Sequence, residues 1–405
     1  MPARVLKRRF LDYLQEFFHD SNSIGIVLFV CTICSLIVAN LSCGSAYIHF
    51  FEMESGLLHS FHLPHTTGHF INDGMMAVFF FLVGLEIKRE LTSGELSSVS
   101  QAILPFGAAI GGMIVPAFIY IIFNKGTIYQ GGWGIPMATD IAFSLGVASM
   151  LGSKFPAALK IFLTALAIID DLGAILVIAF FYGGTVSGIW LLAAAACITL
   201  LWFLNKKKHP FGWMNIFLGI VLWYSVYNSG IHATIAGVFF AFMVPKNQLS
   251  QLEHKLHHVV NFGILPVFAL AKTVRIINLS LIGNLGSNVS LGIFFGLFFG
   301  KPIGVVLASW LLVQHKAVSL PNDVNWGQMA GAGMLAGIGF TMSIFIAALA
   351  FEQKDMQDLS KLVVLIAAVI SIATLFIWMT VVGRNKKPVQ PVTLYDDDEA
   401  YSNFG

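Results

Sequence analysis

Residues 165–174 read ALAIIDDLGA, and they set two adjacent carboxylates, Asp170 and Asp171, in the middle of an apolar run from Leu159 to Tyr182. A run of that length can cross a lipid bilayer as a helix. Each Asp at the centre of a membrane helix opposes insertion by about 2.5 to 3.5 kcal/mol, so the pair opposes it by about 5 to 7 kcal/mol. Carboxylates at that depth pair with a cation or line a wet cavity, which makes both aspartates a candidate functional site. The alternative is a structural ion pair with a buried Lys or Arg.

The composition is that of a polytopic membrane protein. Of its 405 residues, 57% are hydrophobic and 11% are charged, whereas a soluble domain carries about 25% charged residues. The charges lie between the apolar runs and form no basic patch, so no nucleic-acid partner is expected. The basic N-terminus has no small-residue cleavage site after its first apolar run, which predicts a retained first helix rather than a signal peptide.

The pattern of apolar runs predicts an all-α integral membrane protein with twelve transmembrane helices. The predicted spans are 24–41, 69–87, 101–123, 134–150, 159–182, 186–205, 212–229, 231–245, 259–276, 289–312, 327–351 and 359–383. They divide the chain into a cytoplasmic segment 1–23, a membrane domain 24–383 and a disordered cytoplasmic tail 384–405. With both termini in the cytoplasm, 17 of the 23 basic residues fall inside and 5 outside, as the positive-inside rule requires.

Two predicted spans carry helix-breaking residues. Span 134–150 holds Pro136 and a carboxylate, Asp140, and span 327–351 holds a glycine series before Phe340: Gly331, Gly333, Gly337 and Gly339. Interruptions at membrane depth free backbone groups, which must be satisfied within the protein or by cavity water. Such a pair of segments points to an inverted repeat, here spans 3–5 and 10–12, with a binding site at the breaks. Spans 4 and 11 are therefore the predicted interrupted helices.

Charged and small residues near the breaks have assignable roles. Half-helix ends that meet in the interior each carry about half a unit charge. Asp140 has the sign to offset N-terminal ends, and Lys301, the basic residue within span 289–312, has the sign to offset C-terminal ends. The alternatives are a helix cap for Asp140 and an ion pair with a neighbouring aspartate for Lys301. Gly107 and Gly111, four residues apart, predict close helix packing.

Titratable residues also gather at two helix ends that are predicted to be cytoplasmic. One group closes span 69–87 and the other precedes span 259–276: Glu86, Lys88, Arg89 and Glu90, then Glu253, His254, His257 and His258. Mixed charges at helix ends usually form a solvated surface. Histidine titrates near neutrality, however, so the second group is a candidate reader of cytoplasmic pH.

Five segments together resemble the signatures of the NhaA-type bacterial sodium/proton antiporters: ATDIAF (138–143), IIDDLGA (168–174), GIHAT (230–234), GKP (300–302) and GIGFTMS (337–343). The likeness extends over residues 8–385. It implies that spans 4 and 11 are interrupted and cross near the midplane of a bacterial inner-membrane protein. It also implies a transporter, not an enzyme, with no cofactor. The implied activity is pH-activated, electrogenic export of sodium, and of lithium, in exchange for protons.

The resemblance assigns roles position by position. Asp171 matches the principal sodium-binding carboxylate, and Asp170 matches a second carboxylate that pairs with the lysine matched by Lys301. Thr139 and Asp140 match residues beside the site, Asp140 being the charge that compensates the crossed helix ends. Positions tied to pH activation are matched by Glu86, Glu253, His254 and His257, and a position that influences it is matched by His232. The loop before span 69–87 matches a small β-hairpin at the family's dimer interface, which implies a homodimer in membrane lipid.

The chain departs from the family pattern at one place. After PVFALA (266–271) the family continues with Asn-Ala-Gly, whereas this chain continues with Lys272, Thr273, Val274 and Arg275. The two added positive charges are expected to alter local packing at the outer end of span 9 and to leave the ion site untouched.

Two other functions would also place aspartates within a membrane. An intramembrane aspartyl protease would carry its aspartates on neighbouring helices in a Gly-x-Gly-Asp context, which this chain lacks. A proton-coupled transporter of another small solute is the alternative function. It would need aromatic or donor groups around the site, whereas the sequence neighbours of Asp170 and Asp171 are small and aliphatic.

Overall fold

The computed structural model describes residues 22–54, 63–207, 211–273, 279–321 and 323–384. Within these residues the regular structure is helical, apart from one antiparallel β-bridge between Glu54 and Thr66. The segment 1–21 and the tail 385–405 lie outside the described residues, so the predicted domain boundaries stay predictions. Arg275 also lies outside them, whereas Lys272 is the last residue of helix α14 (Leu265–Lys272).

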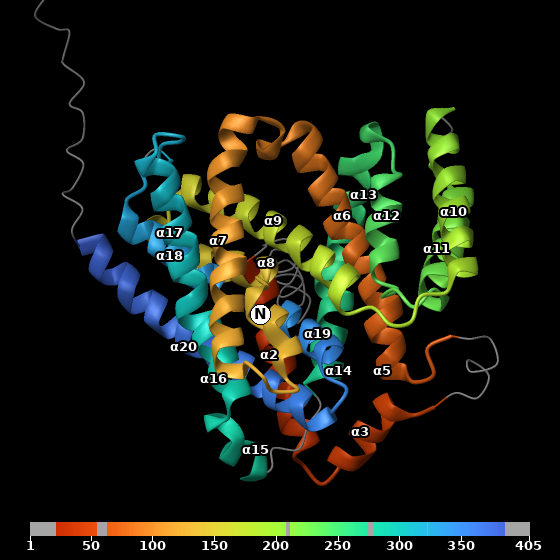
Figure 1. Cartoon of the computed structure of the whole chain (residues 1–405), viewed down its shortest axis with the longest axis horizontal. Coiled ribbons are helices and arrows are strands. Elements are labelled where there is room, and N and C mark those ends of the chain that lie inside the picture. Colours follow the sequence, from red (N-terminus) through yellow and green to blue (C-terminus); the bar gives the residue numbers. More distant parts are fainter. Residues whose placement is uncertain (1–21, 55–62, 208–210, 274–278, 322, 385–405) are drawn as a thin grey trace, which may run out of the picture.

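Six described helices or helix series are long and apolar enough to cross a membrane. They are α5 to α6 (Thr67–Ser93), α7 (Val99–Asn124), α9 (Ala157–Phe181), α10 (Gly188–Lys206), α16 to α17 (Asn288–Gln314) and most of α20 (Lys354–Arg384). Figure 1 shows α8 (Ile141–Met150), α9 and α19 (Phe340–Ala350) near the middle of the bundle, with α10 and α11 (Trp213–Asn228) at one edge. The helix that carries the paired aspartates is therefore an inner helix.

Two further pairs of helices pass the same test together but are sharply bent. The first pair, α2 (Asn22–Ala39) and α3 (Gly44–Glu52), turns through 112°, and the second, α18 (Trp326–Ala336) and α19, turns through 46°. Counting each pair as one span gives eight spans in the described residues. The bend at α3 was not predicted from the sequence.

The remaining four predicted spans contain helices that are too short to meet the same criterion. They are 134–150, 212–229, 231–245 and 259–276, which hold α8, α11, α12 (Ile235–Phe242) and α14. The last of these follows α13 (Leu249–Val259) and the π-helical turn η6 (Val260–Ile264). The count of twelve and the inverted repeat therefore stay predictions.

Glycines allow α7 and α17 (Lys301–Gln314) to pack backbone against backbone. A Cβ added to Gly111 would lie 2.3 Å from the carbonyl oxygen of Gly304, and a Cβ added to Gly304 would lie 2.1 Å from that of Gly111. One added to Gly107 would lie 2.4 Å from Leu312 Cδ1. The predicted close packing at Gly107 and Gly111 is confirmed. It brings the start of α17, and with it Lys301, against α7.

We expect Gly304→Ala to lower the melting temperature of the detergent-solubilised protein. The added methyl meets backbone, which cannot rotate away, and overpacking of this kind typically costs about 1–3 kcal/mol. Gly188→Ala is the matched control, because a Cβ there meets nothing within 4 Å. Melting curves that coincide for the two variants would contradict this account of the α7 and α17 contact.

Candidate functional site

Both segments predicted to be interrupted are broken, and the two breaks touch. The first consists of the 3₁₀ helix η3 (Gln130–Met137), an extended stretch 138–140 and then α8; the second breaks between α18 and α19. The Asp140 amide donates to the Ile338 carbonyl at 2.8 Å. A Cβ on Gly339 would lie 2.8 Å from the Ala138 carbonyl oxygen. The glycine series therefore permits the contact as well as the interruption.

The carbonyl groups freed by the breaks receive donors from the opposite segment. Ser343 Oγ donates to the Ile135 carbonyl at 2.7 Å, and Ser144 Oγ donates to the Leu335 carbonyl at 2.8 Å. Thr139 Oγ1 lies 2.9 Å from the Ala336 carbonyl oxygen. Helix ends at membrane depth need such partners, because lipid supplies none. The two broken helices thus satisfy each other's backbone.

Asp140 holds the N-terminal ends of both following half-helices. Its Oδ1 accepts from the Phe143 amide at 3.0 Å and so caps α8. Its Oδ2 accepts from the Thr341 amide at 3.0 Å and from the Thr341 hydroxyl at 2.5 Å, at the start of α19. The carboxylate is therefore a helix cap and also lies where it can offset two positive helix ends.

Lys301 and Asp170 form an ion pair in the fully buried interior. Lys301 Nζ lies 2.7 Å from Asp170 Oδ2, and both side chains are 0% exposed. Lys301 also donates to the Met137 carbonyl, at the C-terminal end of η3. Thr139 Oγ1 lies 2.7 Å from the same Asp170 oxygen. Lys301 therefore occupies both predicted positions, beside an aspartate and at a negative helix end.

Asp171 differs from its neighbour, because it makes no ion pair and caps no helix end in the described residues, whereas Asp170 pairs with Lys301. Asp171 is 2% exposed, and its Oδ1, like Oδ1 of Asp170, has no hydrogen-bond partner within the part of the chain that the structure describes. The side chain lines a cavity of about 110 Å³, far above the 10–15 Å³ that one water needs. The polar lining residues are Glu86, Asp140, Asp171, His257, Asn261 and Thr341. A buried carboxylate therefore faces a space that can hold an ion or water.

The cavity links the ion site to part of the predicted pH-sensing group. Glu86 from α6 (Met76–Ser93) and His257 from α13 line it together with Asp171. Glu253 lies one turn before His257 on α13 and pairs with Arg89, whose Nε is 2.8 Å from Glu253 Oε2. His254 lies on the same helix.

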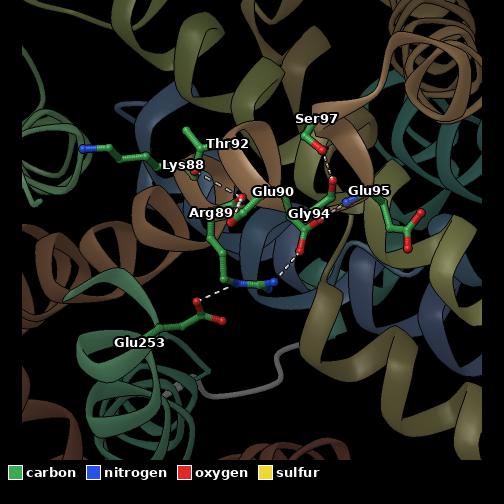
Figure 2. A network of polar contacts seen from close by, with 9 residues as sticks. Lys88, Arg89, Glu90, Thr92, Gly94, Glu95, Ser97 and Glu253 are labelled. Atoms are coloured by element: carbon green, nitrogen blue, oxygen red, sulfur yellow. Dashed lines mark hydrogen bonds and ion pairs between the residues drawn. The ribbon is translucent and has the colours of Figure 1, made fainter. Parts of the chain in front are cut away.

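The charged side chains at the end of α6 bind to neighbouring helices, and they do not simply face solvent. Arg89 Nη1 lies 2.7 Å from Glu90 Oε1, so that one guanidinium joins two carboxylates (Figure 2). Lys88 Nζ donates to the Phe242 carbonyl at 2.7 Å and to the Val244 carbonyl at 2.5 Å. These contacts tie the end of α6 to α13 and to the end of α12. The sequence alone favoured a solvated surface, and that interpretation is wrong here.

His232 is not part of this group. Its Nε2 contacts the Tyr182 carbonyl at the C-terminal end of α9. Tyr182 follows Asp171 by eleven residues, which is about 16 Å along a helix. The structure therefore separates His232 from Glu86, Glu253, His254 and His257.

The surroundings of His257 decide whether its charge changes on the acid or the alkaline side of the ordinary histidine pKa. Burial, together with the neighbouring His258 and His254, lowers the pKa of His257 below the ordinary histidine value. A lowered pKa favours the neutral ring, so His257 becomes positive only at a lower pH than an ordinary histidine does. That charge would repel a cation from the cavity. His257 therefore fits a block on the acid side, and activation above neutrality requires other groups.

Four polar residues at the site were given no role from the sequence: Ser144, Asn261, Thr341 and Ser343. Thr341 and Ser343 belong to the quoted GIGFTMS segment, and their hydroxyls next to the glycine series were the available signal. A donor beside a helix-breaking run is typical of side chains that satisfy freed carbonyls. Asn261 gave no such signal, because it reaches the cavity only through the packing of η6.

We expect Asp140→Ala and Lys301→Met each to lower the melting temperature in detergent. The first leaves two helix ends and the Thr341 hydroxyl without their acceptor, and the second leaves the buried Asp170 charge unpaired, which typically costs about 3–5 kcal/mol. Asp355→Ala, at an exposed position in the first turn of α20, is the control. The account fails if both site variants melt with the parent.

Known proteins resemble this chain over almost its whole length. The Na+/H+ antiporter 1 family matches residues 15–379. The Na(+)/H(+) antiporter NhaA of Cytophaga hutchinsonii is 46% identical over 371 residues, which cover 90% of this chain and 94% of that protein. The Na(+)/H(+) antiporter NhaA 2 of Flavobacterium johnsoniae is 47% identical over 389 residues, which cover 93% and 94%. The Na(+)/H(+) antiporter NhaA of Dechloromonas aromatica is 46% identical over 380 residues, which cover 91% and 96%.

Proposed function

The chain belongs to the Na+/H+ antiporter 1 family, and from this premise we propose that it exports sodium, and also lithium, from the cytoplasm in exchange for protons. The exchange is electrogenic and is activated by rising cytoplasmic pH. The protein resides as a homodimer in a bacterial inner membrane, with both termini in the cytoplasm. The excess of basic residues in the predicted inside segments supports this orientation.

The observation that carries the proposal is the uncompensated carboxylate of Asp171. Lys301 pairs with Asp170, and helix N-terminal ends face Asp140. An ionised Asp171 then makes no ion pair of its own among the described residues, and it faces the cavity. A sodium ion or a proton supplies the missing positive charge. Both neutralise the same oxygens, so they compete for the site, and this competition couples their movements.

The proposed cycle follows from the membrane's resistance to charge. When the cytoplasmic pH rises, the carboxylates lose protons and bind sodium from the cavity side. The neutralised site reorients, releases sodium outside and is reprotonated there. An empty, charged site does not reorient, because an uncompensated carboxylate at membrane depth is costly. The touching breaks in spans 4 and 11 are suited to such a movement, since they join half-helices through a few side-chain contacts.

The number of protons decides whether the cycle moves charge. If two protons replace one sodium, each cycle carries one net positive charge inward. An inside-negative potential then drives sodium out with about 2.3 kcal/mol per charge for each 100 mV. The second proton can come from Asp170 or from Lys301, which share one buried contact. Coupled groups of this kind titrate as a pair.

The alternative is a proton-coupled transporter of another small solute. A specific organic solute requires several placed donors or aromatic rings around it. The cavity at Asp171 offers two carboxylates besides Asp171, one histidine, one amide and one hydroxyl. The other nine lining residues are apolar, with Phe79 as the one aromatic ring among them. The polar groups therefore offer mainly carboxylate oxygens, which favour a cation over an organic solute.

We expect Asp171→Asn to abolish sodium-dependent proton movement in everted vesicles, because the amide cannot supply the negative charge that sodium and protons share. Insertion and melting temperature should change little, since Asp171 makes no ion pair in the described residues. Asp355→Asn is the control carboxylate substitution. Exchange at a rate comparable to that of the parent would show that Asp171 is not the ion ligand.

A separate experiment tests pH sensing away from the ion site. In the combined variant Glu253→Gln, His254→Ala and His257→Ala, the alkaline activation profile should shift at saturating sodium, while the apparent sodium affinity at the optimum is unchanged. Simple competition at Asp170 and Asp171 predicts instead that saturating sodium gives the parent profile. Because Glu253 pairs with Arg89, an Arg89→Gln variant separates loss of the ion pair from loss of titration.

A further inference from the structure

Tyr182 joins the end of α9 to η3, which precedes the break at residues 138–140 in span 134–150. The tyrosine hydroxyl donates to the Gly131 carbonyl at 2.8 Å and accepts from the Gly134 amide at 3.1 Å. Both partners belong to η3, and Tyr182 follows the last residue of α9. One hydroxyl therefore makes two hydrogen bonds to the backbone of an element that lacks regular α-helical bonding.

The approach of Tyr182 to η3 requires a glycine. A Cβ on Gly134 would lie 2.6 Å from the Tyr182 hydroxyl oxygen and 3.2 Å from its Cε2. Next to it, the rings of Trp133 and Phe181 meet edge to face, with centroids 5.1 Å apart. The contact between η3 and the end of α9 thus combines two hydrogen bonds of the hydroxyl with one ring contact, at a partly exposed position.

A second tyrosine holds the other side of η3. Tyr120, from α7, is fully buried and donates to the carbonyl of Tyr129, the residue before η3, at 2.8 Å. A Cβ on Gly132 would lie 2.5 Å from the Tyr120 hydroxyl oxygen. The short 3₁₀ segment is therefore held between two tyrosines at two glycine positions.

The Tyr182 contact also sets the position of η3 along α9. The two elements are joined again at the ion site, where Thr139 contacts Asp170. Twelve residues separate Asp170 from Tyr182, which is about 18 Å of α-helix. From Gly131 to Thr139 the chain makes six 3₁₀ steps to Met137 and two extended steps, which together span about 19 Å. Because the two lengths agree, the tyrosine contact places Thr139 level with Asp170.

The cavity and η3 lie on different sides of the ion site. The residues that line the cavity come from α2, α6, α8, α9, α13, η6, α14 and α19 and from Asp140, and η3 contributes none of them. η3 instead meets the ion site at its C-terminal end, where Lys301, the partner of Asp170, donates to the Met137 carbonyl. His232 Nε2 contacts the Tyr182 carbonyl and must carry a proton to donate there, so it holds the Tyr182 backbone in place.

We propose that Tyr182 is a latch: a positioning residue whose hydroxyl holds η3 against α9 and keeps the ion site closed on the side opposite the cavity. The inference rests on the proposed sodium/proton exchange and names a residue that sets its sidedness. Opening toward the far side must break both hydrogen bonds of the hydroxyl. The latch therefore weights the equilibrium toward the state that is open to the cavity.

The first test is Tyr182→Phe, which keeps the ring and removes both hydrogen bonds. The apparent KM for sodium is measured from the cavity side in everted vesicles and from the opposite side in right-side-out vesicles. The ratio of the first KM to the second should rise about fivefold to tenfold, as expected for the loss of one or two net hydrogen bonds. Tyr47→Phe, which removes a hydroxyl contact to Ser35 between α3 and α2, should leave the ratio unchanged.

A second variant separates the latch from general damage. Gly134→Ala places a methyl against the Tyr182 hydroxyl and should shift the KM ratio in the same direction. Adding Tyr182→Phe to it should produce no further shift, because both substitutions remove one contact. The latch is refuted if the two effects add, or if Tyr182→Phe lowers the rate equally from both sides and leaves the ratio at the parent value.

A third measurement does not require transport, so it distinguishes failure of the latch from failure of the proposed function. Ile135, within η3, is fully buried. In a background whose four native cysteines are replaced, Ile135→Cys should react with a membrane-impermeant thiol reagent, applied from the side opposite the cavity, about fivefold faster when Tyr182→Phe is present. Equal labelling with and without Tyr182→Phe overturns the latch whether or not the parent exchanges sodium.

Discussion

Backbone groups freed inside a membrane must find partners within the protein, and this constraint shapes the centre of the molecule. Two helices break, and each break leaves carbonyl and amide groups where lipid offers no hydrogen bond. The side chains that donate to the freed carbonyls come from the opposite segment: Thr139, Ser144 and Ser343. Asp140 and Lys301 then take the ends that carry partial charge. Asp171 takes no part in these contacts, and its carboxylate faces the cavity.

This arrangement explains why two adjacent aspartates differ in their surroundings. Asp170 faces the breaks and enters their network through Lys301 and Thr139. Asp171, one residue and about 100° further around the helix, faces the cavity instead. A helix that places one carboxylate in a rigid network necessarily turns the next one away from it. Adjacency in the sequence thus yields one paired and one unpaired carboxylate.

Residue chemistry predicted the parts of the site that depend on a single segment. Pro136 and the glycine series indicated the breaks, and the signs of Asp140 and Lys301 indicated which helix ends they meet. The sequence could not predict which carbonyl each hydroxyl reaches, because those pairings join residues about 200 positions apart, such as Ser343 and Ile135. The cross-links of Arg89 to Glu253 and of Lys88 to α12 were missed for the same reason. The separation of His232 from the other titratable groups likewise depends on how the helices assemble.

The Thr139 hydroxyl has one proton and two acceptors within reach, Asp170 Oδ2 at 2.7 Å and the Ala336 carbonyl at 2.9 Å. When Asp170 is ionised, it competes with the Ala336 carbonyl for the hydroxyl proton of Thr139, so the hydrogen bond to that carbonyl is weakened. When Asp170 carries its own proton, it can donate to Thr139, and the hydroxyl is then free to serve the carbonyl fully. The charge on Asp170 therefore decides which acceptor the Thr139 hydroxyl donates to. Protonation of Asp170 strengthens the hydrogen bond from Thr139 to the Ala336 carbonyl at the break between α18 and α19.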